Sequence, residues 1–403
     1  MSLLGKSWKY INEGNAHIVI KIESSKYVLR LIKEERETTS LKCVTNTTEF
    51  VNKVMIPLLT IHDNVNYDII EISENDLIHL LKRLEDVRPI HRKIKSNLSC
   101  YAIRAPNLLI IGPQCVSNYC IEIKPKEGFI PSTLKNSSKC FYCLKQYVKL
   151  NKGQIDSISE YCPLDLFSGN KERMKSALLS LMDNPQNNFK FFRNEVLVFN
   201  ETSSVKDLDE IMKDILPFSN STHLFIDFVI AILLSSNEDV LTMEIPKEMS
   251  STRYKNEKCT EGHELPADSF LYKLLRIQKL SEKYNVDSES FQENTDYVSE
   301  ILNYLDSEKI DLSSEMARET FFTAGHPLHL AMISAIAKDC SIMISFTFDV
   351  TKGLPIINIG GNKASYRIAV TDLEPKSTKT LMKRKKNEKM FFELYKSFRE
   401  IEQ

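Results

Sequence analysis

The chain has 403 residues, 42% hydrophobic and 27% charged, a composition typical of a globular protein with one or two hydrophobic cores. Its formal net charge of −1 excludes a global field that attracts nucleic acid or a membrane surface, so anion binding requires a local group of cations. Nine cysteines, odd in number and scattered, indicate reduced thiols in a cytoplasmic or nuclear setting.

Residues 1–108 predict a small α/β unit. The stretches "AHIVIKI" (16–22) and "KYVLRLIK" (26–33) are expected to pair as a hairpin. An amphipathic helix is expected from Asn46, with Asn46 or Thr47 as its cap, and a second one over "ENDLIHLLKRLEDVRP" from Glu74, ending near Pro89. The N-terminus has no apolar signal core. We therefore expect an N-terminal lobe over residues 1–108.

The stretch "CIEIKPKEGFIP" (120–131) is predicted to be a strand. Because side chains alternate along a strand, Glu122, Lys124 and Lys126 would share one face, with the lysines about 6–7 Å apart. Two interpretations remain open at this point. The face is either a solvated edge with protective lysines or the wall of an anion-binding pocket.

Residues 109–403 predict a larger, helix-rich lobe. The apolar run from Leu224 contains Asp227 and is too short to span a bilayer, so it predicts a buried helix and no membrane segment. Residues 236–265 are polar and predict a flexible insertion. Near the end, "CSIMISFTFDV" and "SYRIAVTDL" predict two paired strands, followed by a basic helix. This order predicts an α+β, bilobal, kinase-like fold with a smaller β-rich N-lobe and an enlarged helix-rich C-lobe.

Candidate phosphate contacts lie in the N-terminal lobe. A turn at Gly14-Asn15 could fold over a triphosphate and offer backbone N–H groups, although a plain hairpin turn has the same pattern. Arg30, on a predicted strand, could neutralise nucleotide phosphates, or it could simply face solvent.

Two aspartates are placed at the ends of predicted strands. Asp339 precedes the strand "CSIMISF" and could accept a hydroxyl proton, while Asp372 ends the next strand and could bind Mg²⁺. The bland alternative for each is an acid that caps or ends an element. Asn187 and Asn188 precede an aromatic strand and could bind phosphates or sugar hydroxyls, or they could form an ordinary turn.

The cysteines leave a metal site open. Cys140 and Cys143 form a single CxxC with Cys162 beyond it, and Cys259 is followed by His263. A structural zinc site needs four ligands. Neither set is closed in the sequence.

Taken together, several motifs resemble one family in order and spacing. They are "EGN" (13–15), "RP" (88–89), "EIKPKEGFIP" (122–131), "YCPLDLFSGNKERM" (161–174), "PQNNFK" (185–190), "AKDCSIMISF" (337–346) and "DLEPK" (372–376). The chain resembles the inositol-pentakisphosphate 2-kinases over most of its length. The resemblance implies a bilobal fold related to protein kinases, ATP and Mg²⁺ as cofactors, and transfer of the γ-phosphoryl of ATP to the 2-hydroxyl of inositol 1,3,4,5,6-pentakisphosphate, giving inositol hexakisphosphate (phytate).

The resemblance also implies residue roles. Asp339 would be the catalytic base, Lys124 would lie between ATP and the inositide, and Asp372 would bind Mg²⁺. The ATP site would contain Gly14, Asn15, Arg30, Glu122, Lys190 and Met343. The substrate site would contain Arg88, Lys126, Lys149, Asn187, Asn188, Lys376 and Arg384.

The sequence departs from the family in places. Thr380 and Arg384 stand where plant members carry an arginine and a tyrosine, leaving Lys379 or Lys383 to substitute, and Lys145 stands in place of a histidine. Plant members bind zinc through Cys and His ligands in the C-lobe, for which no equivalent complete set is found.

The alternative function is a non-catalytic inositide-binding or scaffold protein that uses the same pocket. A protein kinase is not supported, because H-R-D, D-F-G and G-x-G-x-x-G strings are absent. No DNA-binding motif is found, and we expect a monomer.

Overall fold

The structure is a computed structural model. It describes residues 6–23, 25–34, 38–59, 66–93, 97–216, 221–236, 240–243, 258–262, 264–284, 295–359 and 361–402. Most of the predicted insertion at 236–265, including His263, lies outside the described residues.

The N-terminal region is built on a five-stranded sheet with the order β1-β2-β3-β5-β4. Its strands are β1 (Trp8–Glu13), β2 (His17–Ile22), β3 (Tyr27–Glu34), β4 (Asp68–Glu71) and β5 (Asn97–Pro106). β2 and β3 pair antiparallel, with Val19 opposite Arg30, so the predicted hairpin is confirmed.

Each face of this sheet is covered by helix. Helix α3 (Glu74–Val87), capped by Ser73, packs Leu80 and Leu84 against one face, as its apolar spacing predicted. On the other face, α1 (Leu41–Phe50), a π-helical turn (Val51–Met55) and α2 (Ile56–Leu59) follow one another. The prediction that this helix begins at Asn46 is wrong, because it begins at Leu41 and is capped by Ser40, which accepts a hydrogen bond from the Cys43 N–H.

A second sheet forms the centre of the C-terminal region. Its order is β8-β7-β6-β10-β12-β11-β9, antiparallel except for β9 against β11. Its strands are β6 (Tyr119–Ile123), β7 (Phe189–Arg193), β8 (Val196–Phe199), β9 (Val240–Met243), β10 (Ser341–Thr347), β11 (Ile356–Ile359) and β12 (Asn362–Thr371). The predicted pair near the end is therefore β10 with β12, in the centre of the sheet.

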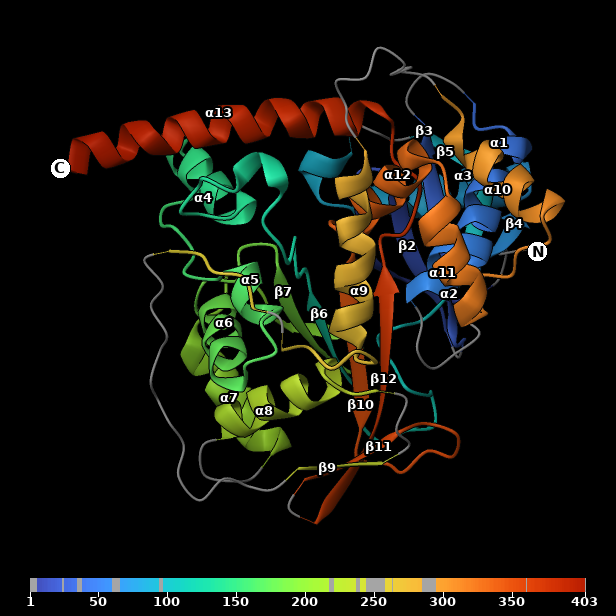
Figure 1. The fold of residues 1–403 in the computed structure, drawn as a ribbon. Coiled ribbons are helices and arrows are strands. Elements are labelled where there is room, and N and C mark those ends of the chain that lie inside the picture. The colour runs from blue at the N-terminus through green and yellow to red at the C-terminus, as the bar shows by residue number, and fades with distance from the viewer. Residues whose placement is uncertain are drawn as a thin grey trace.

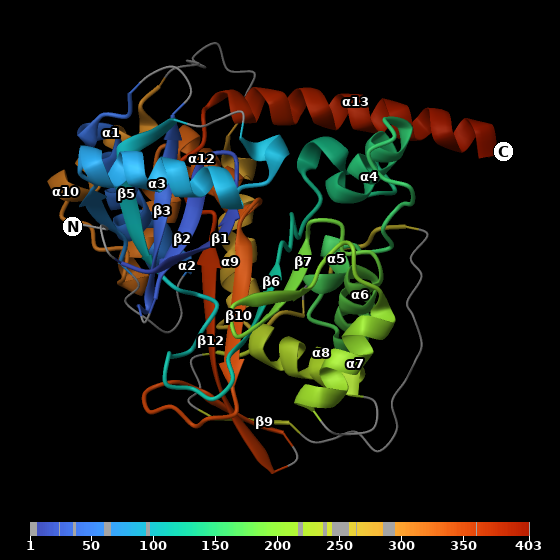
Figure 2. The same cartoon turned by 180° about the vertical axis from the view of Figure 1, so that it is seen from behind.

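Helices surround this sheet in groups (Figure 1). Helices α5 to α8 gather on one side of it, and α10 to α12 lie beside the N-terminal unit, an arrangement also visible from behind in Figure 2. The helices are α4 (Phe141–Asn151), α5 (Pro163–Leu166), α6 (Lys171–Asp183), α7 (Val205–Ile215), α8 (Ser221–Leu233), α9 (Phe270–Lys279), α10 (Tyr297–Ser307), α11 (Glu315–Ala324), α12 (Pro327–Ala337) and α13 (Lys379–Glu402). Short 3₁₀ turns span Ile90–Arg92, Ser132–Leu134 and Leu280–Lys283. Within the described residues, none of the helices combines the length and the apolar character needed to cross a bilayer.

The last helix extends along one edge of the molecule. Helix α13 passes over α4, and its far end carries the C-terminus (Figure 1). Phe391 and Tyr395 of α13 pack against Leu144 and Val148 of α4. This apolar contact holds the basic first turns of α13 close to the α4 helix.

The strand predicted over residues 120–131 is shorter than expected. β6 ends at Ile123, and Lys126 has a positive φ of 62°. The prediction that Lys124 and Lys126 share one strand face is therefore wrong, because the chain has already left the sheet.

The overall architecture agrees with the sequence. A sheet-rich N-terminal region joins a mainly helical C-terminal region, which confirms the α+β kinase-like fold class. The chain crosses between the two sheets after β5, where Arg367 of β12 donates hydrogen bonds to the carbonyl oxygens of Asn107 and Ile110.

Candidate active site

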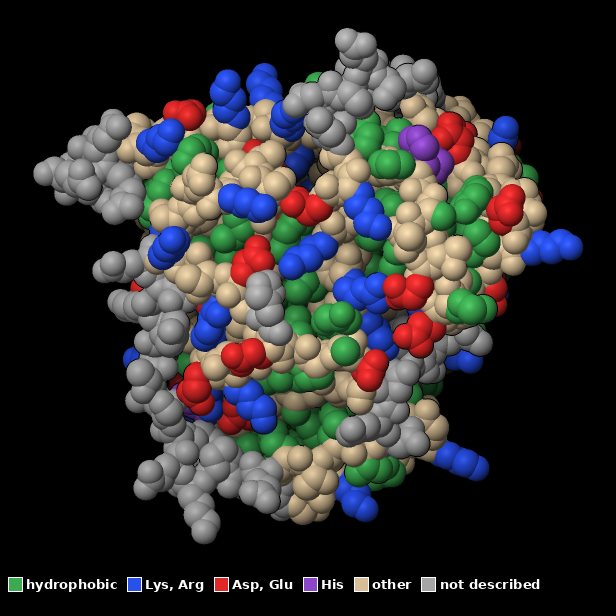
Figure 3. Space-filling view, in the orientation of Figure 1, with side chains coloured by type: hydrophobic (Ala, Val, Ile, Leu, Met, Phe, Trp, Pro, Cys, Tyr) green, Lys and Arg blue, Asp and Glu red, His purple; other side chains and the backbone are tan. Residues whose placement is uncertain are grey.

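A large pocket opens beside the strand ends of the second sheet. Its volume is about 1050 Å³, and it is lined by residues of α4, α12, α13 and the loop that follows β6. On the face shown in Figure 3, lysine and arginine side chains gather along α13 and around the hollow beneath it.

The pocket is strongly cationic. Ten lysine and arginine side chains line it against four acids, although the whole chain is nearly neutral. The cations are Lys124, Lys126, Lys145, Lys149, Lys283, Lys338, Lys376, Lys383, Arg384 and Lys385. Such a concentration of positive charge suits a small ligand that carries several anionic groups.

Asp339 lies at the edge of this pocket, between α12 and β10. Its carboxylate contacts Lys376 Nζ at 2.7 Å and Lys126 Nζ at 3.7 Å, yet its side chain stays 62% exposed. Burial opposes ionisation, but Lys376 and Lys126 hold the pKa of Asp339 below its ordinary value. Asp339 is therefore an accessible carboxylate that can accept a hydrogen bond or a proton from a bound hydroxyl.

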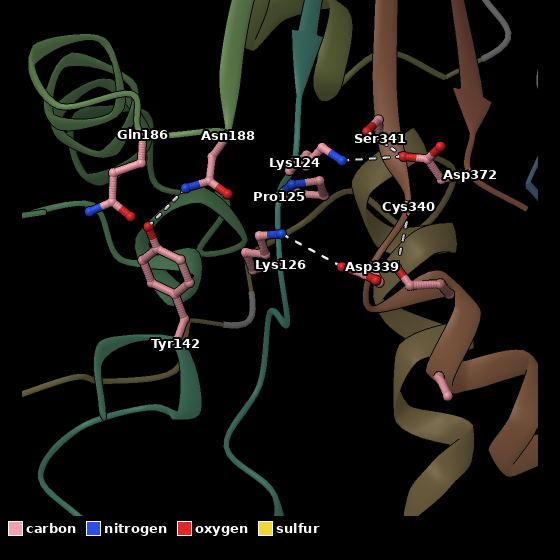
Figure 4. A network of polar contacts seen from close by, with 12 residues as sticks. Lys124, Pro125, Lys126, Tyr142, Gln186, Asn188, Asp339, Cys340, Ser341 and Asp372 are labelled. Carbon is pink, nitrogen blue, oxygen red and sulfur yellow. Dashed lines mark hydrogen bonds and ion pairs between the residues drawn. The ribbon is translucent and has the colours of Figure 1, made fainter. Parts of the chain in front are cut away.

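A second polar group lies next to it (Figure 4). Asp372 Oδ2 accepts hydrogen bonds from Lys124 Nζ at 3.3 Å and from Ser341 Oγ at 3.1 Å. The Ser341 hydroxyl also lies 3.0 Å from Glu122 Oε1. Lys124 thus stands among acids on three adjacent strand ends, between the cationic pocket and the second carboxylate.

Two of these residues have strained backbones. Lys126 has φ 62° and Asp372 has φ 65°. Residues other than glycine rarely adopt this left-handed backbone conformation. Such residues cost about 1–3 kcal/mol each and persist where the surroundings fix them, often at functional sites. The turn after β6 directs Lys126 to Asp339, and the turn after β12 brings Asp372 to Lys124.

The strand register brings three predicted site residues together. Met343 of β10 is opposite Glu122 of β6, and Glu122 is opposite Lys190 of β7, whose Nζ lies 3.4 Å from Glu122 Oε2. Met343 also belongs to a small apolar cluster with Leu109, Cys120 and Phe192. Ile11 of β1 and Leu108 of the crossing segment pack against this cluster. A small apolar cluster bordered by polar groups therefore lies between the two sheets.

The N-terminal candidates lie apart from the cationic pocket. A Cβ added at Gly14 would meet no atom within 4 Å outside its chain neighbours, and the Gly14 carbonyl accepts a hydrogen bond from Lys33 Nζ at 2.8 Å. Asn15 Oδ1 accepts a hydrogen bond from Arg92. Arg30 is buried and paired with Glu374.

Arg88 does not line the pocket. It is buried at the end of α3, where its guanidinium donates to both carboxylate oxygens of Glu13 at 3.1 and 2.9 Å. Lys33 also pairs with Glu13. The predicted role of Arg88 in binding stays a prediction.

The pocket contains residues that the sequence analysis did not assign. Glu127 is buried, and it pairs with Lys338 Nζ at 2.8 Å and with Arg384. Burial disfavours its ionisation, but Arg384 and Lys338 hold the pKa of Glu127 below its ordinary value. No local pattern signalled this role, because Arg384 is 257 residues away in the chain.

Burial and neighbouring cations lower the pKa values of several lysines in the pocket. Burial lowers the pKa of Lys126, Asp339 opposes the shift, and Lys124, Lys145 and Lys149 add to it, which leaves the pKa at about 8. Burial also lowers the pKa of Lys145, Lys149 and Lys338. A bound anion would therefore stabilise the charged form of these lysines.

Four cysteines meet elsewhere in the C-terminal region. The sulfur atoms of Cys140, Cys143, Cys162 and Cys259 all lie within 4.8 Å of one another. The sequence left this ligand set open, and the structure closes it with Cys259, which lies 97 residues beyond Cys162. The conclusion that no complete set exists is thereby corrected for this all-thiol cluster.

Comparison with known proteins agrees with the resemblance found in the sequence. A family model described as inositol-pentakisphosphate 2-kinase matches residues 10–390. The inositol-pentakisphosphate 2-kinase of Danio rerio is 27% identical over 432 aligned residues, which cover 92% of this chain and 89% of that protein. The enzyme of the same name from Oryza sativa subsp. indica is 30% identical over 295 residues, covering 69% of this chain and 60% of that protein. With a family model that spans nearly its whole length, this chain belongs to the inositol-pentakisphosphate 2-kinase family.

Proposed function

We propose that the protein transfers the γ-phosphoryl group of ATP to the 2-hydroxyl of inositol 1,3,4,5,6-pentakisphosphate and so makes inositol hexakisphosphate. The observation that carries the proposal is the cationic pocket with the exposed carboxylate of Asp339 at its edge. A substrate with five phosphates needs cations from several directions, and a kinase needs a carboxylate beside the attacking hydroxyl.

The inositide would occupy the cationic pocket. Lys126 and Lys376 approach from the β6 and β12 sides, and Lys149 approaches from α4. Asn187 and Asn188 line the same wall, and Asn188 donates a hydrogen bond to Tyr142 (Figure 4). These groups supply both positive charge and hydrogen-bond donors with a fixed direction. The donors would fix the orientation of the inositol ring, which charge alone would not.

Asp339 would accept the proton of the 2-hydroxyl as that oxygen attacks phosphorus. The carboxylate is ionised in the free protein because Lys376 and Lys126 stabilise its charge. Lys124, between the two aspartates, would neutralise charge on the transferred group. In this mechanism the protein contributes mainly positioning and electrostatic stabilisation.

ATP and Mg²⁺ are the cofactors of the proposed reaction. Glu122 and Lys190 lie beside Met343 of the apolar cluster between the sheets, and such an apolar surface would suit a nucleobase. The carboxylate oxygens of Asp372 are the hard ligands that Mg²⁺ prefers. Arg30 would reach nucleotide phosphates only after leaving Glu374.

The same proposal includes the lobe boundaries, with residues 1–108 as the N-lobe and residues 109–403 as the C-lobe. Monomeric state and a cytoplasmic or nuclear location stay predictions.

The decisive experiment incubates purified protein with ATP, Mg²⁺ and a panel of inositol phosphates that differ in which hydroxyl is free. We expect turnover of the pentakisphosphate with a free 2-hydroxyl. Binding without turnover would favour the alternative, a non-catalytic inositide-binding protein.

Variants assign the roles. Asp339→Ala should abolish turnover and leave pentakisphosphate binding largely intact. Asp349→Ala is the matched control, because Asp349 follows the opposite end of β10, where it accepts a hydrogen bond from the Val116 N–H. Near-normal turnover of Asp339→Ala would show that the assigned base is wrong.

The two lysines that follow β6 should separate binding from chemistry. Lys126→Ala should weaken inositide binding more than ATP binding, whereas Lys124→Ala should mainly lower kcat. Two equal and small effects would contradict both assignments.

A further inference from the structure

We propose that Gln278, a buried glutamine of α9, is a positioning residue that sets the distance between the Lys126 ammonium group and the Asp339 carboxylate. These two groups come from different segments. Lys126 lies in the turn after β6, and Asp339 lies between α12 and β10, as Figure 4 shows. This role deepens the proposed function and rests on it, because both concern the same site.

Gln278 is a polar residue on a helix face that otherwise buries apolar side chains. Leu271, Leu274 and Leu275 share this face of α9 and are buried, and Gln278 itself is 0% exposed. Burying an amide costs free energy unless its donors and acceptor find hydrogen-bond partners. The partners of Gln278 therefore indicate what the residue does.

The side-chain amide of Gln278 joins two segments of the candidate active site. Its Nε2 donates to the Lys126 carbonyl oxygen at 2.8 Å and to the Ala337 carbonyl oxygen at 3.2 Å. Its Oε1 accepts a hydrogen bond from the Gly128 N–H at 2.9 Å. A primary amide offers two N–H donors and one carbonyl acceptor, and all three are used here. One side chain thus binds the turn after β6 and the last residue of α12 at the same time.

The two carbonyl groups bound by Gln278 lie close in the chain to the groups proposed to bind and react. Lys126 supplies one of them itself, and Ala337 is two residues before Asp339. The Asp339 N–H donates to the Ile336 carbonyl at 3.0 Å, so the last turn of α12 carries the aspartate. Lys126 Nζ lies 3.7 Å from Asp339 Oδ1. The Gln278 amide therefore holds the backbone at both ends of this contact.

Helix α9 is itself attached to α12, so Gln278 acts from a fixed position. The two helices pack against each other (Figure 1). The main-chain carbonyl of Gln278 accepts a hydrogen bond from the buried Ser334 hydroxyl of α12. Lys126 has the left-handed backbone conformation, which persists in residues other than glycine where the surroundings fix it. The two hydrogen bonds from Gln278 to residues 126 and 128 supply such a restraint.

Loss of the amide should affect the inositide more than ATP. Lys126 is assigned to the inositide and Asp339 to the hydroxyl proton, whereas the nucleotide candidates on β6, β7 and β10 are held by the sheet register. A misplacement of about 1 Å can lower a rate about 100-fold. Gln278→Leu, which keeps a similar volume without hydrogen-bonding groups, should therefore lower kcat about 10- to 100-fold and raise the Kd for the pentakisphosphate about three- to tenfold. The KM for ATP should stay within about twofold of the wild-type value.

Ser269→Ala is the matched control for lost stability. Ser269 is as buried as Gln278, caps the opposite end of the same helix, and forms its hydrogen bonds within residues 266–273. This variant should lower the Tm and leave kcat and the Kd for the pentakisphosphate unchanged. A Gln278→Leu protein that behaves in the same way, with a lower Tm and wild-type kcat and Kd, would overturn the positioning role.

A double-mutant cycle tests whether Gln278 acts through Lys126. Calorimetry measures the Kd for the pentakisphosphate in the wild type, Gln278→Leu, Lys126→Ala and the double variant. If Gln278 places the lysine, Gln278→Leu should change the Kd by less than about twofold once Lys126 is already alanine. Additive effects of the two substitutions on the Kd would overturn the positioning role.

Gln278→Glu covers the case in which Gln278→Leu fails to fold. It keeps the length of the side chain and the acceptor for the Gly128 N–H, but it turns a carboxyl group toward two carbonyl oxygens. Burial raises the pKa of such a carboxyl group, and only its protonated form can donate to one of the carbonyls. The kcat of Gln278→Glu relative to wild type should therefore rise as the pH falls from about 8 to about 6. A ratio that stays constant over this range would overturn the positioning role.

Binding and turnover separate this role from the proposed function. Coupling between Gln278 and Lys126 in the Kd of a protein that shows no turnover would count against the proposed function alone. Turnover of the pentakisphosphate with additive effects of the two substitutions would count against the positioning role alone. A protein that does not bind the pentakisphosphate would overturn both.

Discussion

Glu127 provides a test in which two physical arguments predict opposite signs. It is one of four acids in a pocket proposed to bind a polyanion. If charge alone mattered, Glu127→Gln would remove a repulsive group and tighten inositide binding. The structure predicts the reverse, because the Glu127 side chain is only 5% exposed and its two oxygens are engaged by Lys338 and Arg384.

The magnitude follows from what the carboxylate holds in place. Burial lowers the pKa of Lys338, and the charge of Glu127 is the main interaction that raises it again. Without that charge the pKa of Lys338 would fall further, and Arg384 would keep Glu388, at 2.7 Å, as its acidic partner. A hydrogen bond to a charged group contributes about 1.5–3 kcal/mol, so one misplaced cation corresponds to about a 10- to 100-fold rise in KM for the inositide.

The assay measures KM for the inositide and for ATP, together with thermal stability. Glu127→Gln should raise only the inositide KM, and it should also destabilise the fold by roughly 3 kcal/mol, the cost of breaking a buried ion pair. Glu282→Gln is the control, because Glu282 lines the same pocket but is exposed and accepts a hydrogen bond from the Ser132 N–H. A lower inositide KM for Glu127→Gln would refute the positioning argument.

Lys126, the pocket cations and Gly169 each allow a further test. Lys126 has a pKa of about 8, so it loses its proton as the pH rises through 8. Inositide affinity should therefore fall by about tenfold between pH 7 and pH 9, the effect of one lost contact. An affinity that calorimetry finds unchanged over this range would contradict the prediction. Pentakisphosphate affinity should fall steeply with added salt while the Tm changes little, because the pocket cations attract the ligand through screened charge; salt-independent titrations would contradict it. Gly169→Ala should lower stability by more than 3 kcal/mol, whereas Gly153→Ala, also at positive φ but in open space, should cost about 1–2 kcal/mol; equal losses in thermal denaturation would contradict the contact with Glu264.

The sequence predicted features that depend on neighbouring residues. The β2–β3 hairpin and helix α3 appear where alternating and helical spacing placed them. Asp339 and Asp372 flank paired strands, as expected from their positions beside apolar runs. These are local properties, since periodicity reports which face of an element is buried.

Features that depend on distant or unusual backbone geometry were not predictable. Lys126 reaches Asp339 through a left-handed turn that no glycine marks. Cys259 completes the sulfur cluster from 97 residues beyond Cys162, and Arg384 meets Glu127 across 257 residues. Local patterns in a single sequence do not reveal such long-range contacts, because the contacts result from the packing of α4, α13 and the segment 258–262.

The acids of the pocket divide into two kinds, and this division explains how ten cations can coexist without ligand. Glu127 is buried and cannot be displaced by an arriving phosphate, so it serves as a permanent counter-charge for Lys338 and Arg384. Asp339 is 62% exposed and shares Lys126 and Lys376 with whatever anion enters. In the proposed reaction, substrate phosphates would take over these lysines, so Asp339 would lose the contacts that lower its pKa and would become a stronger base when the substrate hydroxyl arrives. Replacing the buried acid should therefore damage binding, and replacing the exposed one should damage chemistry.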